Sequence, residues 1–385
     1  MEQSAAVFLT FFTDLPDPRQ AAKVLYPLPE ILLILLCGTL AGADDFVEIV
    51  TWADQQQEFL RRFLPFAQGI PSHDTLGDVV GALDPELFGA CFAAWVDSLR
   101  AATPQAPDGA QDEPAVIAID GKTSRRSHDR KRGRDPLHLL SAWASRERLV
   151  LGQEAVSGKS NEIKAIPRLL QRLDLSGALV TIDAMGTQRD IADIILQRGG
   201  NYVLSLKANW PAMLAAAKSV FEQATAATLQ TFQTSERAHG RTETRQVSVC
   251  TDLPAFFTRK GTRDSPAFPG VGMLARIEST TERGDKIETD TRYFLCSTQL
   301  SAKQLARVVR THWHIENRLH WVLDVVFHED LARLRNDNAP ANMAIVRHMA
   351  INLLRQATPT MSLKNRRKRA GWNTTYLEAV LRQAT

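Results

Sequence analysis

The stretch Ala115-Val-Ile-Ala-Ile-Asp120-Gly-Lys122 is a short apolar run that ends on a carboxylate and then turns at a glycine. A run this apolar predicts a β-strand covered on both faces, which places Asp120 at an open edge of an α/β sheet. The same arrangement returns at Leu179-Val-Thr-Ile-Asp183, which Ala-Met-Gly186 follows. Two buried strands that each end on an aspartate could hold both carboxylates side by side.

A third acid, Glu316, lies in a segment with the residue spacing of a helix. Its neighbours on one face, at steps of three and four residues, are Leu305, Val309, His312, Leu319 and Leu323. We therefore expect one helix through this segment, with Glu316 in the apolar stripe. A buried carboxylate is costly unless a cation compensates it, so a divalent metal would resolve a site with two further aspartates.

The composition is that of a globular protein: 385 residues, 44% of them hydrophobic, enough for a large core and for two or three domains. The longest apolar run, residues 31–43, is too short to cross a bilayer and predicts a buried helix. The four cysteines are scattered, with no CxxC pair for zinc. These features favour a cytoplasmic protein without a membrane partner.

Positive charge is concentrated in two places, although the net charge is only +3. One basic run follows Asp120 closely, and the other, residues 364–369, lies near the C-terminus. The first run comprises Lys122, Arg125, Arg126, Arg130, Lys131, Arg132 and Arg134. A basic run beside an acidic cluster suits a polyanion whose phosphates must approach a metal.

Four regions follow from composition and periodicity. Residues 1–100 are predicted to form a small helical domain, either structural or DNA-binding, and residues 101–114 a linker rich in Ala, Pro, Asp and Gln. Residues 115–361 are predicted to form the catalytic domain, interrupted by a β-rich insertion at about 211–299. Residues 362–385 are predicted to form a basic tail.

Within residues 115–206 the predicted elements follow the order βββαβαβ. The strands are expected at 115–119, 137–143, 149–156, 179–182 and 202–206, with the second and third paired as a hairpin. Thr187 to Asp190 resembles a capping box that opens the second helix, which Gly199-Gly200 would end. An acid after the first strand and another after the fourth is the pattern of a ribonuclease-H-like α/β core.

Six phrases of the chain together resemble the insertion-sequence transposases of the Asp-Asp-Glu type, in the branch that includes the H-repeat-associated proteins. They are Ile119-Asp-Gly-Lys122, Lys159-Ser-Asn-Glu-Ile163, Thr181-Ile-Asp-Ala-Met185, Tyr202-Val-Leu-Ser-Leu-Lys-Ala-Asn209, His239-Gly-Arg-Thr-Glu-Thr-Arg245 and His312-Trp-His-Ile-Glu-Asn-Arg-Leu-His-Trp-Val-Leu-Asp-Val325. Residues 28–75 also look like the region that precedes the catalytic core in this branch.

The resemblance implies a DNA transposase with Asp120, Asp183 and Glu316 as both catalytic residues and metal ligands. Three carboxylates without thiolates suit Mg²⁺ or Mn²⁺, and two ions are expected. The implied partner is double-stranded DNA, both the terminal inverted repeats and the target, bound by a homodimer. The candidate DNA contacts are Lys122, Arg125, Arg126, Lys207, Asn209, His239, Arg241, Arg245, Arg310, His312 and Arg318.

One departure concerns the cation that contacts the terminal phosphate. Many related transposases have Tyr and Arg before the glutamate and Lys after it, where this chain has Val309, His312 and Leu323. His312, Arg310 and Arg318 are therefore candidates for that contact.

Several alternatives stay open at this stage. The histidines around Glu316 allow a zinc site, although the HExxH spacing is missing. Trp313 and Trp321 are expected to pack in the core, with stacking on a DNA base as the functional alternative. The same carboxylates would also serve a nuclease that does not join strands, and a DNA-binding remnant without catalysis is a third possibility.

Overall fold

The computed structural model describes residues 7–102, 114–156, 161–225, 228–238, 240–258, 268–357 and 360–382. These residues form two compact units. The terminal unit comprises residues 1–105, 121–161 and 316–385, and the central unit comprises residues 106–120 and 162–315. Strand β1 (Ala115–Thr123) begins in the central unit and ends in the terminal unit. Most of the predicted linker, and Lys159 and Ser160, lie outside the described residues.

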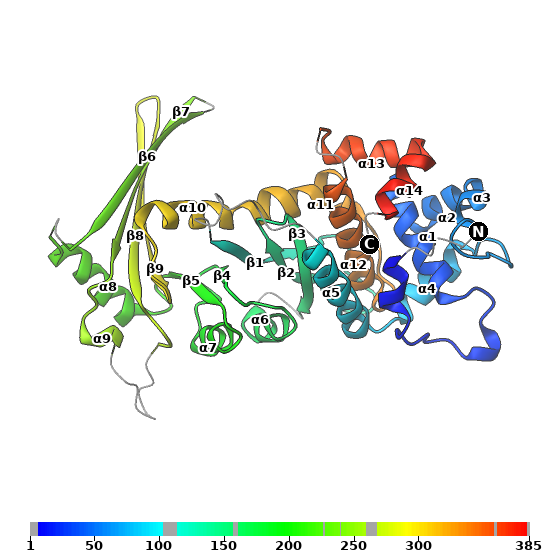
Figure 1. Ribbon diagram of the computed structural model, residues 1–385, viewed down its shortest axis with the longest axis horizontal. Coiled ribbons are helices and arrows are strands. Elements are labelled where there is room, and N and C mark those ends of the chain that lie inside the picture. The colour runs from blue at the N-terminus through cyan, green and yellow to red at the C-terminus, as the bar shows by residue number, and fades with distance from the viewer. Residues whose placement is uncertain are drawn as a thin grey trace. The chain divides into compact units, whose positions relative to one another are not determined.

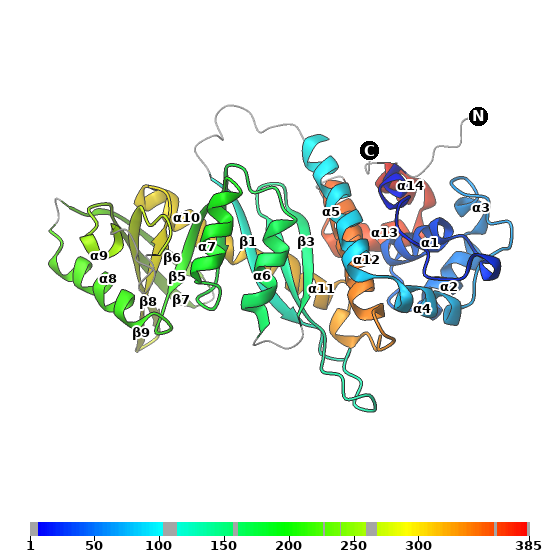
Figure 2. The same cartoon turned by 90° about the horizontal axis from the view of Figure 1, so that it is seen from below.

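The central unit is built on parallel strands joined by helices. β1 pairs in parallel with β4 (Ala178–Ile182), and β4 pairs in parallel with β5 (Asn201–Leu206). Helices α6 (Glu162–Gln171) and α7 (Arg189–Gln197) precede and follow β4 and lie side by side (Figure 2). The chain therefore has the expected ribonuclease-H-like α/β core.

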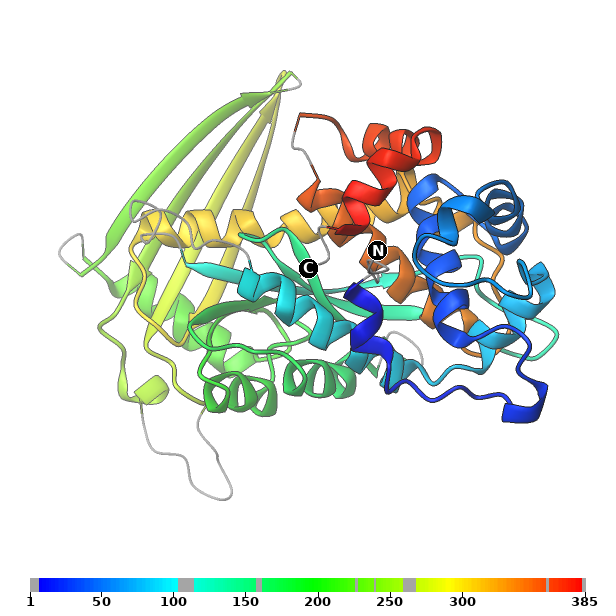
Figure 3. The ribbon, with the colours of Figure 1, turned by 45° about the vertical axis from the view of Figure 1, so that its right-hand side comes forward.

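The predicted β-rich insertion extends this sheet. β5 pairs in antiparallel fashion with β9 (Lys286–Cys296), and β8 (Met273–Arg283), β7 (Arg241–Cys250) and β6 (Gln230–Ala238) follow in that order. Figures 1 and 3 show these four strands as long antiparallel ribbons. Helices α8 (Pro211–Gln223) and α9 (Ala255–Thr258) belong to the same region.

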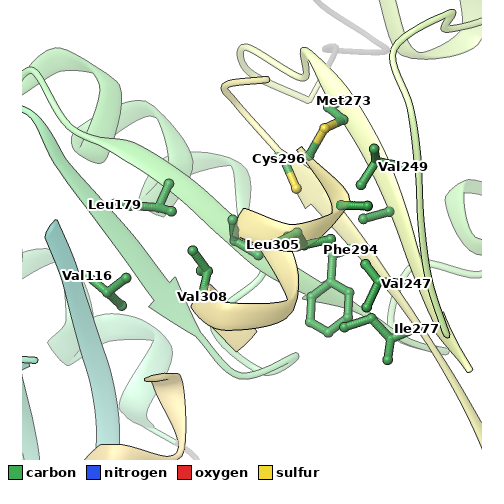
Figure 4. Packing of buried hydrophobic residues seen from close by; sticks show 13 residues of the cluster. Val116, Leu179, Val247, Val249, Met273, Ile277, Phe294, Cys296, Leu305 and Val308 are labelled. Carbon is green, nitrogen blue, oxygen red and sulfur yellow. The ribbon is translucent and has the colours of Figure 1, made fainter. Parts of the chain in front are cut away.

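The hydrophobic core of the central unit joins the insertion to the parallel strands. Helix α10 (Ala302–His312), which begins at a capping box formed by Ser301 and Gln304, packs on one face of the sheet. Its side chains Leu305 and Val308 meet Val116 of β1 and Leu179 of β4, as Figure 4 shows. Because successive strand residues point to opposite faces, every second residue of β1 and β4 faces α10.

The terminal unit is mainly helical. Its hydrophobic helix α1 (Leu28–Ala41) is buried through most of its length, as the apolar run predicts, and packs against α2, α12 and α13 (Figure 1). Around it lie η1 (Val7–Phe12), η2 (Ala21–Lys23), α2 (Phe46–Gln55), α3 (Gln57–Leu60), α4 (His73–Ala82), α5 (Pro85–Ala102), η6 (Glu329–Leu331), α12 (Ala339–Gln356), α13 (Leu363–Trp372) and α14 (Thr374–Arg382). The hairpin of β2 (His138–Ala144) and β3 (Leu149–Val156) has the predicted antiparallel pairing.

Two local predictions are wrong. The side chain of Thr187 does not cap α7, since its hydroxyl donates a hydrogen bond to the carbonyl oxygen of Ser205 at 2.6 Å and the N-cap is Gln188. The basic residues near the C-terminus are not in an extended tail but in helix α13. There Arg367 is buried, and its Nε donates to the carbonyl oxygen of Thr39 at 3.0 Å, so this basic residue holds α13 against α1.

In the described part of the chain, no single helix is long and apolar enough to cross a membrane. Helices α4 and α5 meet these two criteria only when they are taken together, and the pair is bent by 90°.

Candidate active site

Asp120 and Asp183 occupy equivalent positions on neighbouring strands. Ile119 of β1 lies opposite Ile182 of β4, so each aspartate follows one member of this pair. By strand alternation Asp120 belongs to the same face as Val116, and Asp183 to the same face as Leu179, which is the face that α10 covers. Asp120 is partly exposed and Asp183 is exposed, so both carboxylates can be reached from solvent.

A tight turn fixes the carboxylate of Asp183. Its Oδ1 accepts hydrogen bonds from the backbone N–H groups of Met185 and Gly186 at 3.0 and 3.2 Å. Gly186 approaches β4 so closely that a Cβ atom there would lie 2.2 Å from Cγ2 of Ile182, which excludes any larger residue without rearrangement. The turn therefore orients Asp183, and its other oxygen, Oδ2, can serve a ligand.

His312 anchors the C-terminal end of α10 to β4. Its Nδ1 and the hydroxyl of Thr181 share a hydrogen bond of 2.9 Å. Burial lowers the pKa of His312, while the negative charge of Asp183 opposes this shift. The lowered pKa disfavours the charged form of the imidazole, so it gives no support to the expectation that His312 supplies a cation to a phosphate, which stays a prediction.

The expected continuous helix around Glu316 is interrupted. α10 ends at His312, a π-helical turn follows at Glu316–His320, and α11 (Trp321–Val325) completes the segment. A π turn holds more residues than an α turn and rotates the side chains that follow. As a result Leu319 is buried as predicted, whereas the side chain of Glu316 is 56% exposed and does not lie in the apolar stripe.

His320 is the hydrogen-bonding partner of Glu316 within the π turn. Its Nδ1 lies 3.0 Å from Oε2 of Glu316, and its side chain is only 5% exposed. The histidine thus orients the carboxylate from the buried side. Sequence reasoning noted the four-residue step between the two residues but gave His320 no role toward Glu316.

Trp313 and Trp321 are not core residues, contrary to the expectation. Their exposed fractions are 51% and 54%. Trp313 lies under the guanidinium group of Arg292, at 6.0 Å from the ring centroid. Helical spacing with apolar neighbours therefore misled the prediction for both residues.

Lys122 is held by acids of its own chain and does not face a phosphate. Its Nζ lies 2.8 Å from Asp324, 3.1 Å from Glu329 and 3.3 Å from Asp330, and its side chain is 10% exposed. Burial acts to lower the pKa of Lys122, but the charges and hydrogen bonds of Glu329 and Asp324 together outweigh it, so the pKa is raised. These ion pairs give no support to a DNA contact at Lys122, which stays a prediction. We call Asp324, Glu329 and Asp330 the acidic clamp.

The acidic clamp was missed from the sequence. Its only signal there is the group of acids that begins eight residues after Glu316, which is indistinguishable from a solvated turn. The partner, Lys122, lies some 200 positions earlier in the chain, so only the fold brings them together.

The other candidate DNA contacts differ in their freedom to bind. Arg126, Lys207 and Arg241 are exposed, whereas Asn209 donates to the carbonyl oxygen of Ala184 at 2.8 Å. Three arginines have carboxylate partners: Arg125 with Asp330, Arg245 with Glu243 and Arg310 with Glu236. Arg318 is partly buried beside other arginines. His239 lies outside the described residues.

Comparison with known proteins gives the family. A model of the transposase DDE domain matches residues 111–353, and a model of the region associated with that domain matches residues 9–96. The chain belongs to the DDE-type transposase family.

Curated relatives agree with this assignment over nearly the whole chain. The chain is 36% identical over 373 residues to the "H repeat-associated putative transposase YhhI" of Escherichia coli K12, covering 95% of each protein. It is 37% identical over 380 residues to the "Putative transposase YncI" of E. coli O157:H7, covering 97% of this chain and 94% of that protein. A solved piggyBac transposase synaptic complex with hairpin DNA aligns at a TM-score of 0.42 and 11% identity, over 98% of this chain and 81% of that one.

The residues of the site fit the divalent metal that this family implies. Asp120, Asp183 and Glu316 offer carboxylate oxygens that solvent can reach, and such hard ligands suit Mg²⁺ or Mn²⁺. The two histidines that lie four residues before and after Glu316, His312 and His320, have different partners, Thr181 and Glu316. This arrangement gives no support to the alternative of a zinc site built from both.

Proposed function

We propose that this protein cuts the ends of an insertion sequence and joins them to target DNA, with Asp120, Asp183 and Glu316 as the catalytic carboxylates. The observation that carries the proposal is the pairing of Ile119 with Ile182, which delivers two aspartates in register at the ends of parallel strands. Parallel strands of an open α/β sheet offer their carboxyl ends as the usual place for a site.

The chain itself limits where Glu316 can lie. His312 is bonded to Thr181, two residues before Asp183, and Glu316 follows four residues after His312. Four residues reach at most about 14 Å even when fully extended. This short connection to His312 supports the proposal that Glu316 joins the two aspartates as the third carboxylate.

Asp120, Asp183 and Glu316 would hold two divalent ions. Such a pair of ions activates a water or a 3′-hydroxyl and stabilises the leaving oxygen during attack on a phosphodiester. The roles of the chain are to fix Asp183 through its turn and Glu316 through His320.

The proposed partner is double-stranded DNA, both the terminal inverted repeats and the target. The exposed side chains of Arg126, Lys207 and Arg241 are proposed as phosphate contacts. Arg125, Arg245 and Arg310 could join them by exchanging a carboxylate for a phosphate. Bringing two DNA ends together implies a homodimer, working in the cytoplasm on the nucleoid.

A strand-transfer assay tests the proposal. Duplexes carrying the DNA that flanks the coding region are incubated with the protein in Mg²⁺ and in EDTA. We expect cut and joined products in Mg²⁺ only, and loss of both in Asp120→Asn, by a factor of at least about 10³, with duplex binding retained.

Other outcomes would replace the proposal. Cut product without joined product would indicate a nuclease, and a mobility shift alone would indicate a remnant that only binds DNA. An Asp120→Asn protein that still cuts would remove this residue from the chemistry.

A further inference from the structure

Three arginines of the terminal unit, without carboxylate partners among the described residues, lie on segments that hydrogen bonds join: Arg355 donates to the carbonyl oxygen of Arg318, and Asn352 of α12 bonds the backbone of Val150, two residues after Arg148. Arg318 lies in the π turn, Arg355 lies near the end of α12, and Arg148 lies in the turn of the β2–β3 hairpin. We call them the arginine cluster. Most buried or half-buried arginines of this unit are neutralised otherwise: Arg347 meets Glu329, and Arg367 meets Asp44.

Arg355 is the fixed member of the cluster. Its guanidinium carbon lies 4.7 Å from the centroid of the Trp143 ring, which is fully buried in β2, and its Nη2 donates to the carbonyl oxygen of Arg318. Its Nε is buried and has no hydrogen-bond partner. Stacking and the one backbone bond therefore hold the group in place while part of its donor capacity is unused.

The charges of the cluster act on one another. Burial, and after it the positive charges of Arg318 and Arg148, lowers the pKa of Arg355 to about 10. Burial and then Arg148 also lower the pKa of Arg318. The like charges of the cluster are therefore kept close together at a cost that no carboxylate among the described residues offsets.

The three arginines of the cluster differ in their exposure to solvent. Arg148 is exposed at the hairpin turn, in the left-handed conformation with a φ of 59°, and Arg318 and Arg355 are partly buried. An anion can therefore reach the cluster from outside and meet donors at increasing depth. Guanidinium groups bind phosphate oxygens through paired N–H donors, and a phosphate would offset the repulsion among them.

We propose that Arg148, Arg318 and Arg355 form a binding site for one backbone phosphate of the DNA substrate. The proposal rests on the proposed function for its ligand, because Arg318 is two residues from Glu316 and a phosphate held there is next to the reacting one. Many related transposases have an arginine and a lysine where this chain has His312 and Leu323. The arginine cluster would supply positive charge in their place.

Duplex binding in EDTA tests the site without any cutting. We compare the full chain with Arg148→Gln, Arg318→Gln and the double variant, using a duplex that carries the flanking DNA over a range of salt concentrations. Each single variant is expected to weaken binding about tenfold and to reduce the salt slope by about 1. The double variant should reduce the slope by about 1 as well, since one phosphate is lost in every case.

Two controls make the result specific. Arg146→Gln, an exposed change in the same hairpin turn, should bind within about twofold of the unaltered protein. A scan with single neutral methylphosphonate linkages should find one position that weakens the unaltered protein and has no further effect on Arg148→Gln. Thermal unfolding shows that the variants are folded.

The proposal is overturned if both single variants keep the original affinity and slope, if Arg146→Gln loses as much as they do, or if the double variant loses a slope of about 2. These outcomes are independent of catalysis. A protein that binds as expected but fails to cut in Mg²⁺ would contradict the proposed function and leave the phosphate site standing.

Discussion

His348 is a titratable side chain enclosed in the terminal unit, 1% exposed, with the Phe92 ring 6.4 Å away. Burial lowers its pKa to about 4; Glu329 opposes this shift, and His320, Arg347 and Lys122 add to it. In the unfolded chain the pKa is near 6.5, so between these values the unfolded state binds more protons than the folded state. The contribution of His348 to the free energy of unfolding is therefore fully present above pH 6.5 and is lost as the pH decreases toward 4.

The expected size of this loss is about 3 kcal/mol for His348 alone. Urea unfolding at intervals between pH 7 and pH 4 measures it. The variant His348→Leu should show a shallower decline over that range, because the titrating group is gone. Equal declines in the two proteins would show that His348 is not the group responsible.

At the scale of single residues, what could be predicted depended on local signals. Asp120 and Asp183 could be found because each follows an apolar strand. The pairing of His312 with Thr181, and of Lys122 with the acidic clamp, joins positions 131 and about 200 residues apart. No local pattern marks such pairs, and so the partners of His312 and Lys122 within the chain could not be predicted.

At the scale of elements, the acidic clamp connects β1 to the segment that carries Glu316. Lys122 is two residues after Asp120, Asp324 lies in α11, and Glu329 and Asp330 lie in η6. Removing one partner of a buried ion pair leaves the other uncompensated. The clamp thus favours one arrangement of the end of β1 and the chain that follows Glu316.

Lys122→Met should lower the free energy of unfolding by about 3 to 5 kcal/mol, because Glu329 is then buried without its main cation. Adding Glu329→Gln should recover part of the loss. Lys131→Met, at an exposed position of the same loop region, should change stability by less than about 0.5 kcal/mol. Urea unfolding compares the four proteins.

The acidic clamp would be contradicted if Lys122→Met had normal stability and a salt slope for duplex binding reduced by about 1. That result would support the predicted phosphate contact at Lys122.

Strands and long helices could be predicted because their periodicity is local. Strands β3 and β4 and helix α1 lie within a few residues of expectation. The π turn could not be predicted, since residues 313–320 also have the spacing of an α-helix and the Arg318 carbonyl finds its donor, Arg355, on another helix. Glu316, Trp313 and Trp321 lie within or next to that turn, where the predicted apolar stripe does not hold.

At the scale of the whole molecule, the account depends on three acids from distant parts of the chain holding the same ions. The two aspartates are in register on neighbouring strands of the central unit. Glu316 begins the last segment of the terminal unit, four residues after the anchor at His312. The family assignment and the tether agree, and the convergence of the third carboxylate is the claim to test.

The most direct measurement is Mn²⁺ binding, followed by electron paramagnetic resonance, to the unaltered protein with duplex DNA and to Asp120→Asn, Asp183→Asn and Glu316→Gln. We expect each substitution to weaken Mn²⁺ binding at least about tenfold while duplex affinity stays within about threefold. A Glu316→Gln protein that binds Mn²⁺ as tightly as the unaltered one would contradict a metal site shared by the three acids.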